Sequence, residues 1–114
     1  MNKQEFLDKL NSDPECISFA DTMAVIDANY RYTPVSFKNG EAENPAGSNE
    51  GSCKLFAFAL LNKLDKQQTL ACFGDYYRKD VLQHPDAEDH ANIRNFMRSG
   101  WQGISFEAQA LEDK

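Results

Sequence analysis

The segment 49-NEGSCKLFAFALL-61 decides how this chain folds, because a polar stretch gives way here to an apolar run. Cys53, Phe56 and Leu60 mark one face of a helix, and Leu55 and Phe58 cover much of another. A helix that is apolar on most of its sides is buried at the centre of a fold. We therefore expect a central helix that begins near residue 52, with the other elements packed around it.

A long polar segment, residues 39–52, precedes this helix, and its only apolar side chains come from alanines and a proline. Loops longer than about 12–15 residues are uncommon in compact domains and are often functional. The segment opens with Asn39-Gly40, which is a strong turn signal. The residues that follow, 41–45, make a poor strand, so we do not expect a complete hairpin here.

Two segments carry the pattern of β-strands. Residues 30–37 (YRYTPVSF) are aromatic and β-branched, which is typical of a strand. Their alternation slips at Pro34, which indicates a bulge or an edge strand. Apolar residues alternate again from Gly103 to Ala110. We expect this second strand to pair antiparallel with the first, with helices packed on the pair.

Helical patterns cover most of the remaining chain. The first two helices are expected at residues 2–11 and from Pro14 or Ser18 to residue 28. A capping-box pattern at Asp65 starts a further helix, whose apolar stripe runs to Val81 and which ends at residues 83–85. The last helix would follow an N-cap at Asp86. Together with the central helix, these patterns predict an α+β fold that is mostly helical, with about four to five helices packed on a small antiparallel sheet.

Composition limits the possible partners of this chain. With 114 residues it is expected to form a single domain, residues 1–114. Its net charge of −6 repels phosphate backbones, so we expect neither nucleic acid nor a membrane as a partner. Its three cysteines are widely spaced and include no CxxC pair. This favours free thiols in a reducing cytoplasm over disulfides or structural zinc.

The cysteine near the start of the central helix raises the question of thiol catalysis. A helix N-terminus lowers a thiol pKa, and His90 could serve as the base of a Cys53–His90 pair. Against this, Cys53 lies on the apolar stripe, where cysteines commonly pack without reacting, and the neighbouring Glu50 would raise the thiol pKa. A hydrolase or transferase that uses Cys53 and His90 is therefore the alternative hypothesis for the function.

Two kinds of ligand chemistry are not expected. Residues 47–54 (GSNEGSCK) superficially resemble a phosphate-binding loop, but the glycine spacing is one residue short and the lysine is displaced. Acidic residues gather in the 39–52 segment and at residues 86–90, yet without EF-hand or HExxH spacing. We therefore expect no metal site and no cofactor.

A polar cluster is the site that the sequence favours most. The long 39–52 segment has many backbone groups to satisfy, and asparagine, glutamate and arginine side chains do this well. We expect these side chains to join the segment to the start of the last helix, residues 88–95, with Glu50 reaching a cation such as His90 or Arg94. The expected members are Asn39, Asn44, Asn49, Glu50, His90, Asn92, Arg94 and Asn95.

These same segments resemble a known family, the HopJ type III effectors. The resemblance rests on residues 37–59, which contain NEGSCKLFAFA, on residues 69–78 (TLACFGDYYR) and on residues 89–103 (DHANIRNFMRSGWQG). It covers nearly the whole chain, in order and in spacing. It implies an effector role, and it carries over neither an activity nor catalytic residues.

From these observations we expect a small, soluble, cytoplasmic protein that binds a protein or a small ligand through the 39–52 segment and the 88–95 helix. Its oligomeric state stays open. The resemblance also implies delivery by type III secretion. The chain begins almost directly with a helix, however, which leaves little room for the flexible, serine-rich leader that effectors often carry. We therefore expect it to act in the cytoplasm.

Overall fold

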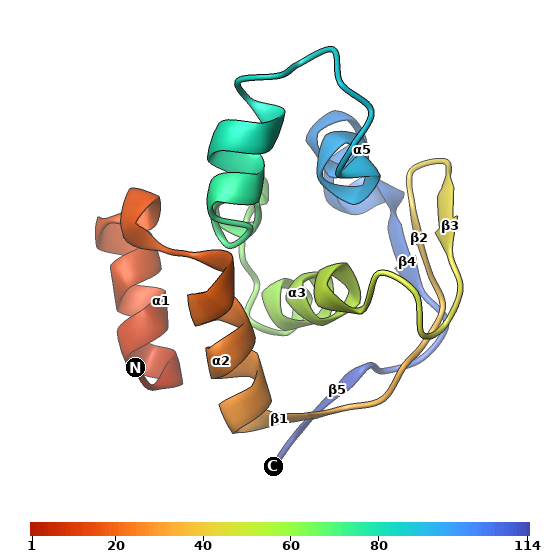
Figure 1. The fold of residues 1–114 in the computed structure, drawn as a ribbon. Coiled ribbons are helices and arrows are strands. Elements are labelled where there is room, and N and C mark those ends of the chain that lie inside the picture. The colour runs from red at the N-terminus through yellow and green to blue at the C-terminus, as the bar shows by residue number, and fades with distance from the viewer.

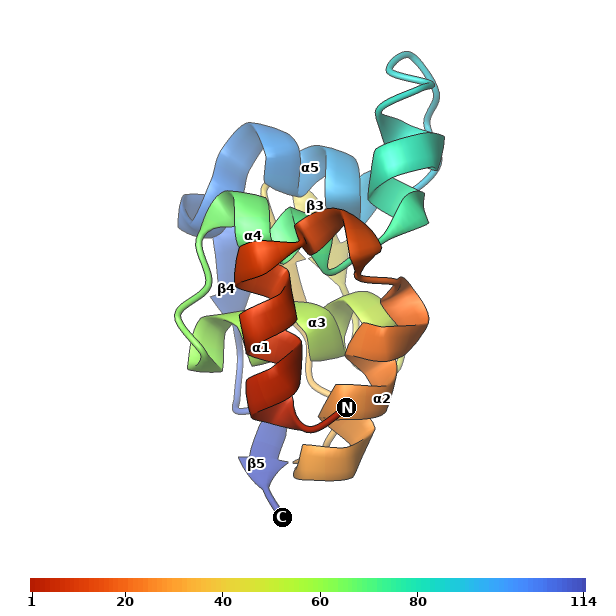
Figure 2. The same ribbon diagram turned by 90° about the vertical axis from the view of Figure 1, so that its left-hand side faces the viewer.

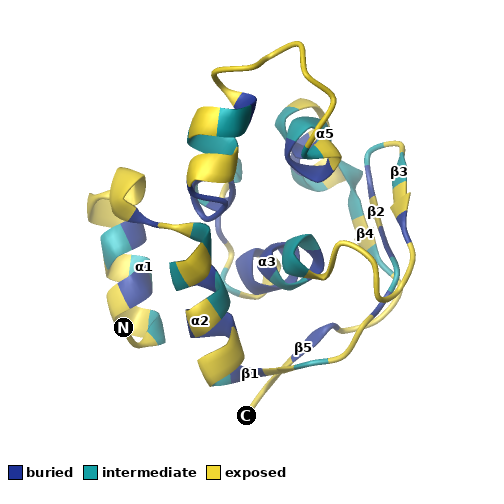
Figure 3. Cartoon of the chain, in the orientation of Figure 1, coloured by how far each residue is buried: buried dark blue, intermediate teal, exposed yellow.

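Helix α3, Glu50–Leu61, forms the centre of the fold in the computed structural model, which describes residues 1–114. Its Leu55, Phe56 and Phe58 side chains are completely buried, and Figure 3 shows buried residues along most of the helix. The helices α1 and α2 lie on one side of α3, the strands β2–β4 and helix α5 lie on the other, and β1 and β5 lie below it (Figure 1). The central position predicted for this helix is therefore confirmed.

The N-terminal helices cover one side of α3. They are α1 (Lys3–Ser12), the short 3₁₀ helix η1 (Pro14–Cys16) and α2 (Phe19–Asn29). Phe6 of α1 packs edge-on against Phe58 of α3, with ring centroids 5.7 Å apart, and Figure 2 shows α1 in front of α3. Of the two starts that the sequence allows for the second helix, Ser18 is the N-cap of α2, because the chain makes only a short turn at Pro14.

Five short strands form two small antiparallel sheets. The strands are β1 (Tyr30–Tyr32), β2 (Phe37–Asn39), β3 (Ala42–Asn44), β4 (Ile104–Phe106) and β5 (Leu111–Asp113). β1 pairs with β5, and β2 pairs with both β3 and β4. The two expected strands pair antiparallel as predicted, but each is interrupted, and the second resumes as β5 beyond its predicted end at Ala110. The interruption in the first falls around Pro34, which has no amide hydrogen to donate to a ladder.

The prediction that no complete hairpin follows residue 39 is wrong, because β2 and β3 pair in register. At the turn, Gly40 adopts a φ of 62°, and a Cβ there would lie 2.9 Å from Oγ of Ser99 in α5. The amide of Gly40 also donates to the carbonyl of Gly103 at 2.9 Å. Contacts with the C-terminal third of the chain thus hold a hairpin that its own strand residues do not favour.

The segment after α3 forms two helical pieces in place of the single helix predicted from Asp65. The pieces are α4 (Lys66–Ala71) and the π-helix η2 (Tyr76–Val81). The predicted capping box at Asp65 does begin α4. Between the two pieces, Gly74 has a φ of 63°, and a Cβ there would lie 2.7 Å from the backbone nitrogen of Phe19. This close approach to the start of α2 requires a glycine and breaks the helix.

The last helix, α5 (Ala91–Ser99), continues into the short helix η3 (Gly100–Gly103) and packs against β2 and β3. The predicted N-cap at Asp86 is wrong, since His90 is the residue that precedes α5. Residues 82–89 instead form an exposed loop, which projects from the body of the molecule in Figure 2. Trp101 folds back as predicted, and its Nε1 donates to the carbonyl of Leu64 at 3.0 Å.

A single cluster of buried side chains joins these elements. Phe56 lies near its middle, with ring centroids 5.0–6.3 Å from those of Phe37, Phe73, Phe96 and Trp101. The predicted α+β class and its mostly helical character are confirmed, and η1, η2 and η3 add helical segments to the expected four to five. None of the helices combines the length and apolar character that a membrane crossing requires.

Candidate functional site

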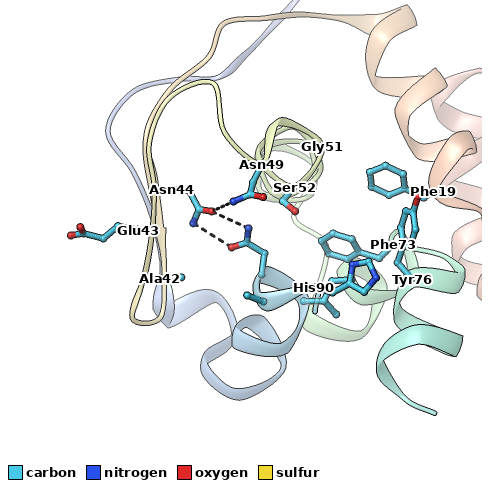
Figure 4. A pocket seen from close by; sticks show the side chains of 13 residues that line it. Phe19, Ala42, Glu43, Asn44, Asn49, Gly51, Ser52, Phe73, Tyr76 and His90 are labelled. Carbon is cyan, nitrogen blue, oxygen red and sulfur yellow. Dashed lines mark hydrogen bonds between the residues drawn. The ribbon is translucent and has the colours of Figure 1, made fainter. Parts of the chain in front are cut away.

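A cleft of about 450 Å³ opens between the β2–β3 hairpin, the start of α3 and the start of α5 (Figure 4). Sites for small ligands commonly measure about 300–1,000 Å³. Side chains of α2, of Phe73 and of η2 close its remaining side. The cleft therefore lies between the two segments, 39–52 and 88–95, that the sequence analysis selects.

Four asparagines join the hairpin to the two helix starts. Asn92 is central, because its Oδ1 accepts from Nδ2 of Asn39 at 3.0 Å and from Nδ2 of Asn44 at 3.3 Å. Nδ2 of Asn92 donates in return to Oδ1 of Asn44 at 3.0 Å, and Nδ2 of Asn49 donates to the same oxygen at 2.7 Å. Asn39, Asn44 and Asn92 are buried. Their mutual hydrogen bonds replace most of those that water would make, and Oδ1 of Asn39 is the buried polar atom of the three that has no partner.

Both helices at the cleft begin with a residue in the left-handed conformation. Asn49 has a φ of 50° before α3, and His90 has a φ of 52° before α5. Neither side chain caps the helix that follows it. The amide groups of residues 50–52 and 91–93 donate to no atom of the chain. Free amides and the positive end of the helix dipole favour hydrogen-bond acceptors at both starts.

The opposite wall of the cleft is aromatic. Phe19 and Phe73 are stacked with centroids 6.2 Å apart, and Tyr76 meets Phe19 edge-on at 5.2 Å. The Tyr76 ring also lies 5.1 Å from that of His90, and 45% of Tyr76 is exposed. No sequence pattern assigns these phenyl and phenol rings to a site. No local signal marks them, because α2 and a π-helix must first meet in three dimensions.

His90 stands between the cleft and the exposed loop. Its Nε2 lies 3.0 Å from Oδ2 of Asp80 and 3.9 Å from Oδ2 of Asp89. The contact with Asp80 suits a proton on Nε2 and orients the imidazole ring. Nδ1 has no partner in the chain. Asp80 lies in η2, and no sequence pattern predicts its contact with His90.

Arg94 lies outside the cleft and holds the exposed loop. Its Nη2 lies 2.7 Å from Oδ1 of Asp89, and its Nε donates to the carbonyl of Asp89 at 2.6 Å. Its Nη1 donates to the carbonyl of His84 at 3.0 Å. The hydrogen bond from Arg94 lowers the pKa of the Asp89 carboxyl below its ordinary value, and the charge of His90 acts in the same direction.

The predicted pairing of Glu50 with His90 or Arg94 is wrong. Glu50 is exposed and forms no ion pair. The two cations are taken by carboxylates closer to them in the sequence, at positions 80 and 89. Asn95 does not join the asparagine network either, since its Oδ1 accepts from Arg98 on the same helix. The structure therefore brings Asn39, Asn44, Asn49 and Asn92 into one network, places His90 beside the cleft, and leaves the other three outside.

Cys53 is a packing residue of α3. It is 1% exposed, and its Sγ donates to the carbonyl of Val35 at 3.8 Å. Burial raises the pKa of the Cys53 thiol, so little thiolate forms at neutral pH. His90 contacts Asp80, Asp89 and the ring of Tyr76, and makes no hydrogen bond to the thiol. This geometry does not favour the alternative Cys53–His90 enzyme.

The charges at the cleft are few. No lysine or arginine lines it, and Glu43 is the carboxylate among its lining residues. Figure 4 shows the Glu43 side chain pointing away from the other labelled groups. No group of three or more histidine, cysteine, aspartate or glutamate side chains is arranged to hold a metal ion. The cleft offers amide donors and ring faces, which is the chemistry of non-covalent binding.

Comparison with known proteins identifies the family. The family model described as HopJ type III effector protein matches residues 3–111, so this chain belongs to the HopJ family. The chain is also similar to the crystal structure of an unknown function protein, VPA0580. The sequence identity is 60% and the TM-score is 0.99, and the match covers 100% of this chain and 95% of that one. Comparison with the curated proteins gave no match.

Proposed function

We propose that this HopJ protein is a non-catalytic binding protein, and that its ligand occupies the cleft between the hairpin and the starts of α3 and α5. The ligand is a small molecule or an exposed segment of another protein. The observation that carries the proposal is the cleft itself. Its volume of about 450 Å³ suits a small ligand, and it forms where segments distant in the sequence meet.

The asparagine network supports this proposal, because it makes the polar wall rigid. Asn44 and Asn92 bond to each other through both ends of their amides, so neither side chain needs a ligand to complete it. A pre-organised wall reduces the ordering that binding requires. The free amides at both helix starts remain as donors for a ligand that carries acceptors.

The test is a fragment screen by ¹H–¹⁵N correlation spectroscopy on the full chain, with a variant that fills the cleft. Ala91 lines the cleft and is exposed, so Ala91→Trp places an indole in it. Ala28 is exposed on α2 and away from the cleft, so Ala28→Trp is the matched control. Fragments should shift the amides of residues 50–52 and 91–93. Their binding should be lost in Ala91→Trp and kept in Ala28→Trp.

Two outcomes would overturn the proposal. In the first, fragments bind Ala91→Trp as well as the native chain. In the second, every bound fragment maps to another depression, such as the one between α1 and η2 that Leu10, Tyr77 and Arg78 line. Equal melting temperatures of the two tryptophan variants would exclude unfolding as the cause of lost binding.

We also propose that the protein acts in the cytoplasm of the cell that makes it. The support is the state of its thiols, since Cys53 and Cys72 are buried and unpaired, as is usual in a reducing compartment. The family description as a type III effector suggests the other destination. A translocation reporter fused to the full chain should give no signal in a host cell exposed to a type III apparatus, and a clear signal would overturn this assignment.

A further inference from the structure

We infer that the cleft takes a flat, uncharged ring compound with a carbonyl or ring-nitrogen acceptor on one edge. This inference rests on the binding function proposed above and deepens it by naming the class of ligand. Three observations carry it: aromatic rings on one wall, of which Tyr76 is exposed, amide donors on the other, and the absence of lysine and arginine from the lining.

The rings on one wall are accessible to a ligand. Tyr76 is 45% exposed, and its ring touches those of Phe19 and His90 at centroid distances of 5.2 and 5.1 Å. Figure 4 shows these rings gathered on one side of the cleft, with Asn44 and Asn49 on the other side. A ligand ring placed against Tyr76 would extend an arrangement of stacked and edge-on contacts that aromatic groups prefer. A saturated ring of the same size cannot make these aromatic contacts and should bind more weakly.

The donors on the other wall favour an acceptor. The amides of Gly51, Ser52 and Ala91 belong to residues that line the cleft, and they donate to no atom of the chain. A ligand with a bare hydrocarbon edge would strip water from these amides without replacing its hydrogen bonds, which is unfavourable. A carbonyl or ring nitrogen on that edge replaces them.

The charges around the cleft disfavour an anionic and a cationic form of such a ligand for different reasons. No lysine or arginine lines the cleft to pair with a carboxylate or phosphate. Glu43 and the exposed Glu50 lie nearby, and the chain carries a net charge of −6, so an anion would be repelled. An ammonium ion would instead meet the positive ends of two helices. The neutral compound avoids both conflicts.

The experiment compares four probes of similar size on the full chain: benzamide, benzoate, benzylammonium and cyclohexanecarboxamide. Binding is followed by the shifts of the amides of residues 50–52 and 91–93. Benzamide should bind several-fold more tightly than each of the other three. The Tyr76→Leu variant should weaken benzamide about two- to tenfold, the range of one aromatic contact. Tyr76→Phe, which keeps the ring, should bind benzamide as tightly as the native chain does.

A matched control uses the next residue of η2. Tyr77 lines a different depression, beside Leu10 and Arg78, so Tyr77→Leu should leave benzamide binding at the cleft unchanged. A loss that was equal in Tyr76→Leu and Tyr77→Leu would indicate damage to η2 and would contradict a specific ring contact.

The outcomes separate this inference from the proposed function. Tighter binding of benzoate or benzylammonium to the same amides would overturn the ligand class and leave the cleft as a binding site. Equal binding of cyclohexanecarboxamide and benzamide would remove the role of the rings. If none of the four probes shifts these amides at millimolar concentration, the proposed class of ligand is wrong. The fragment screen then decides whether the cleft binds another kind of compound.

Discussion

Replacing Asn92 with alanine should destabilise the protein more than any other single change in the asparagine network. Asn92 Oδ1 accepts from Asn44 at 3.3 Å and from Asn39 at 3.0 Å, and its Nδ2 donates to Asn44 at 3.0 Å. All three side chains are buried. Water therefore cannot simply take the place of the lost amide.

The expected loss in the free energy of unfolding follows from the hydrogen bonds that each partner of Asn92 retains. Nδ2 of Asn44 loses its only acceptor in the chain, and a buried donor left in this state costs about 1–3 kcal/mol. Nδ2 of Asn39 keeps the carbonyl of Asn92 at 2.7 Å, so it loses only a second bond, about 1 kcal/mol. The free energy of unfolding should therefore fall by about 2–4 kcal/mol. At roughly 4 °C per kcal/mol, the melting temperature should fall by about 8–16 °C.

The assay is urea denaturation of the native chain, Asn92→Ala, Asn44→Ala and the double variant. Because the partners bond to each other, the double variant should be less destabilised than the sum of the singles, by about 1 kcal/mol or more. Asn95→Ala, on the same helix but bonded only to Arg98, is the control and should stay within about 0.5 kcal/mol. Additive effects, or a loss below about 1 kcal/mol for Asn92→Ala, would refute the reasoning.

Three further predictions follow from single residues. Gly74→Ala should lower the free energy of unfolding by about 2 kcal/mol or more, because a Cβ there meets backbone at 2.7 Å. Gly47→Ala, also at positive φ but with nothing within 4 Å, should cost about 1 kcal/mol by the same denaturation assay. Burial raises the Cys53 pKa, so iodoacetamide should modify Cys53 only after unfolding, as peptide mapping would show. The Asp89 pKa is lowered by Arg94, so the Asp89–Arg94 ion pair stabilises the fold at neutral pH. This contribution is lost as the pH falls through the lowered pKa. Arg94→Ala should therefore raise the Asp89 pKa in an NMR titration.

The parts of the fold that the sequence predicts correctly depend on local rules. The apolar run over residues 53–59 is buried on most of its sides, as a central helix requires, and only Leu60 and Leu61 at its end are exposed. Asp65 is followed three residues later by Gln68, and this pair forms the predicted capping box. Such patterns concern neighbours within one turn of helix, which the sequence displays directly.

The parts that the sequence does not predict depend on contacts between distant residues. The helix breaks at Gly74 because the start of α2 packs against this residue. No pattern within residues 65–81 predicts that contact. The hairpin depends on α5 in the same way. The sequence predicts the polar cluster only in part. Its asparagines can be assigned to one site because two segments are rich in them, but the partner of Glu50 cannot, since nearer carboxylates compete for the same cations.

Two of the residues with left-handed backbone conformation border the proposed binding cleft. Three non-glycine residues have positive φ: Asn49, Lys63 and His90. Lys63 follows the end of α3, where the left-handed conformation is ordinary. The other two precede helices, both border the cleft, and asparagine is a preferred N-cap. Asn49 nevertheless directs its amide to Asn44 and leaves the first turn of α3 uncapped. Stability alone favours a capped helix, so the uncapped amides at both starts agree with the proposal that a ligand completes them.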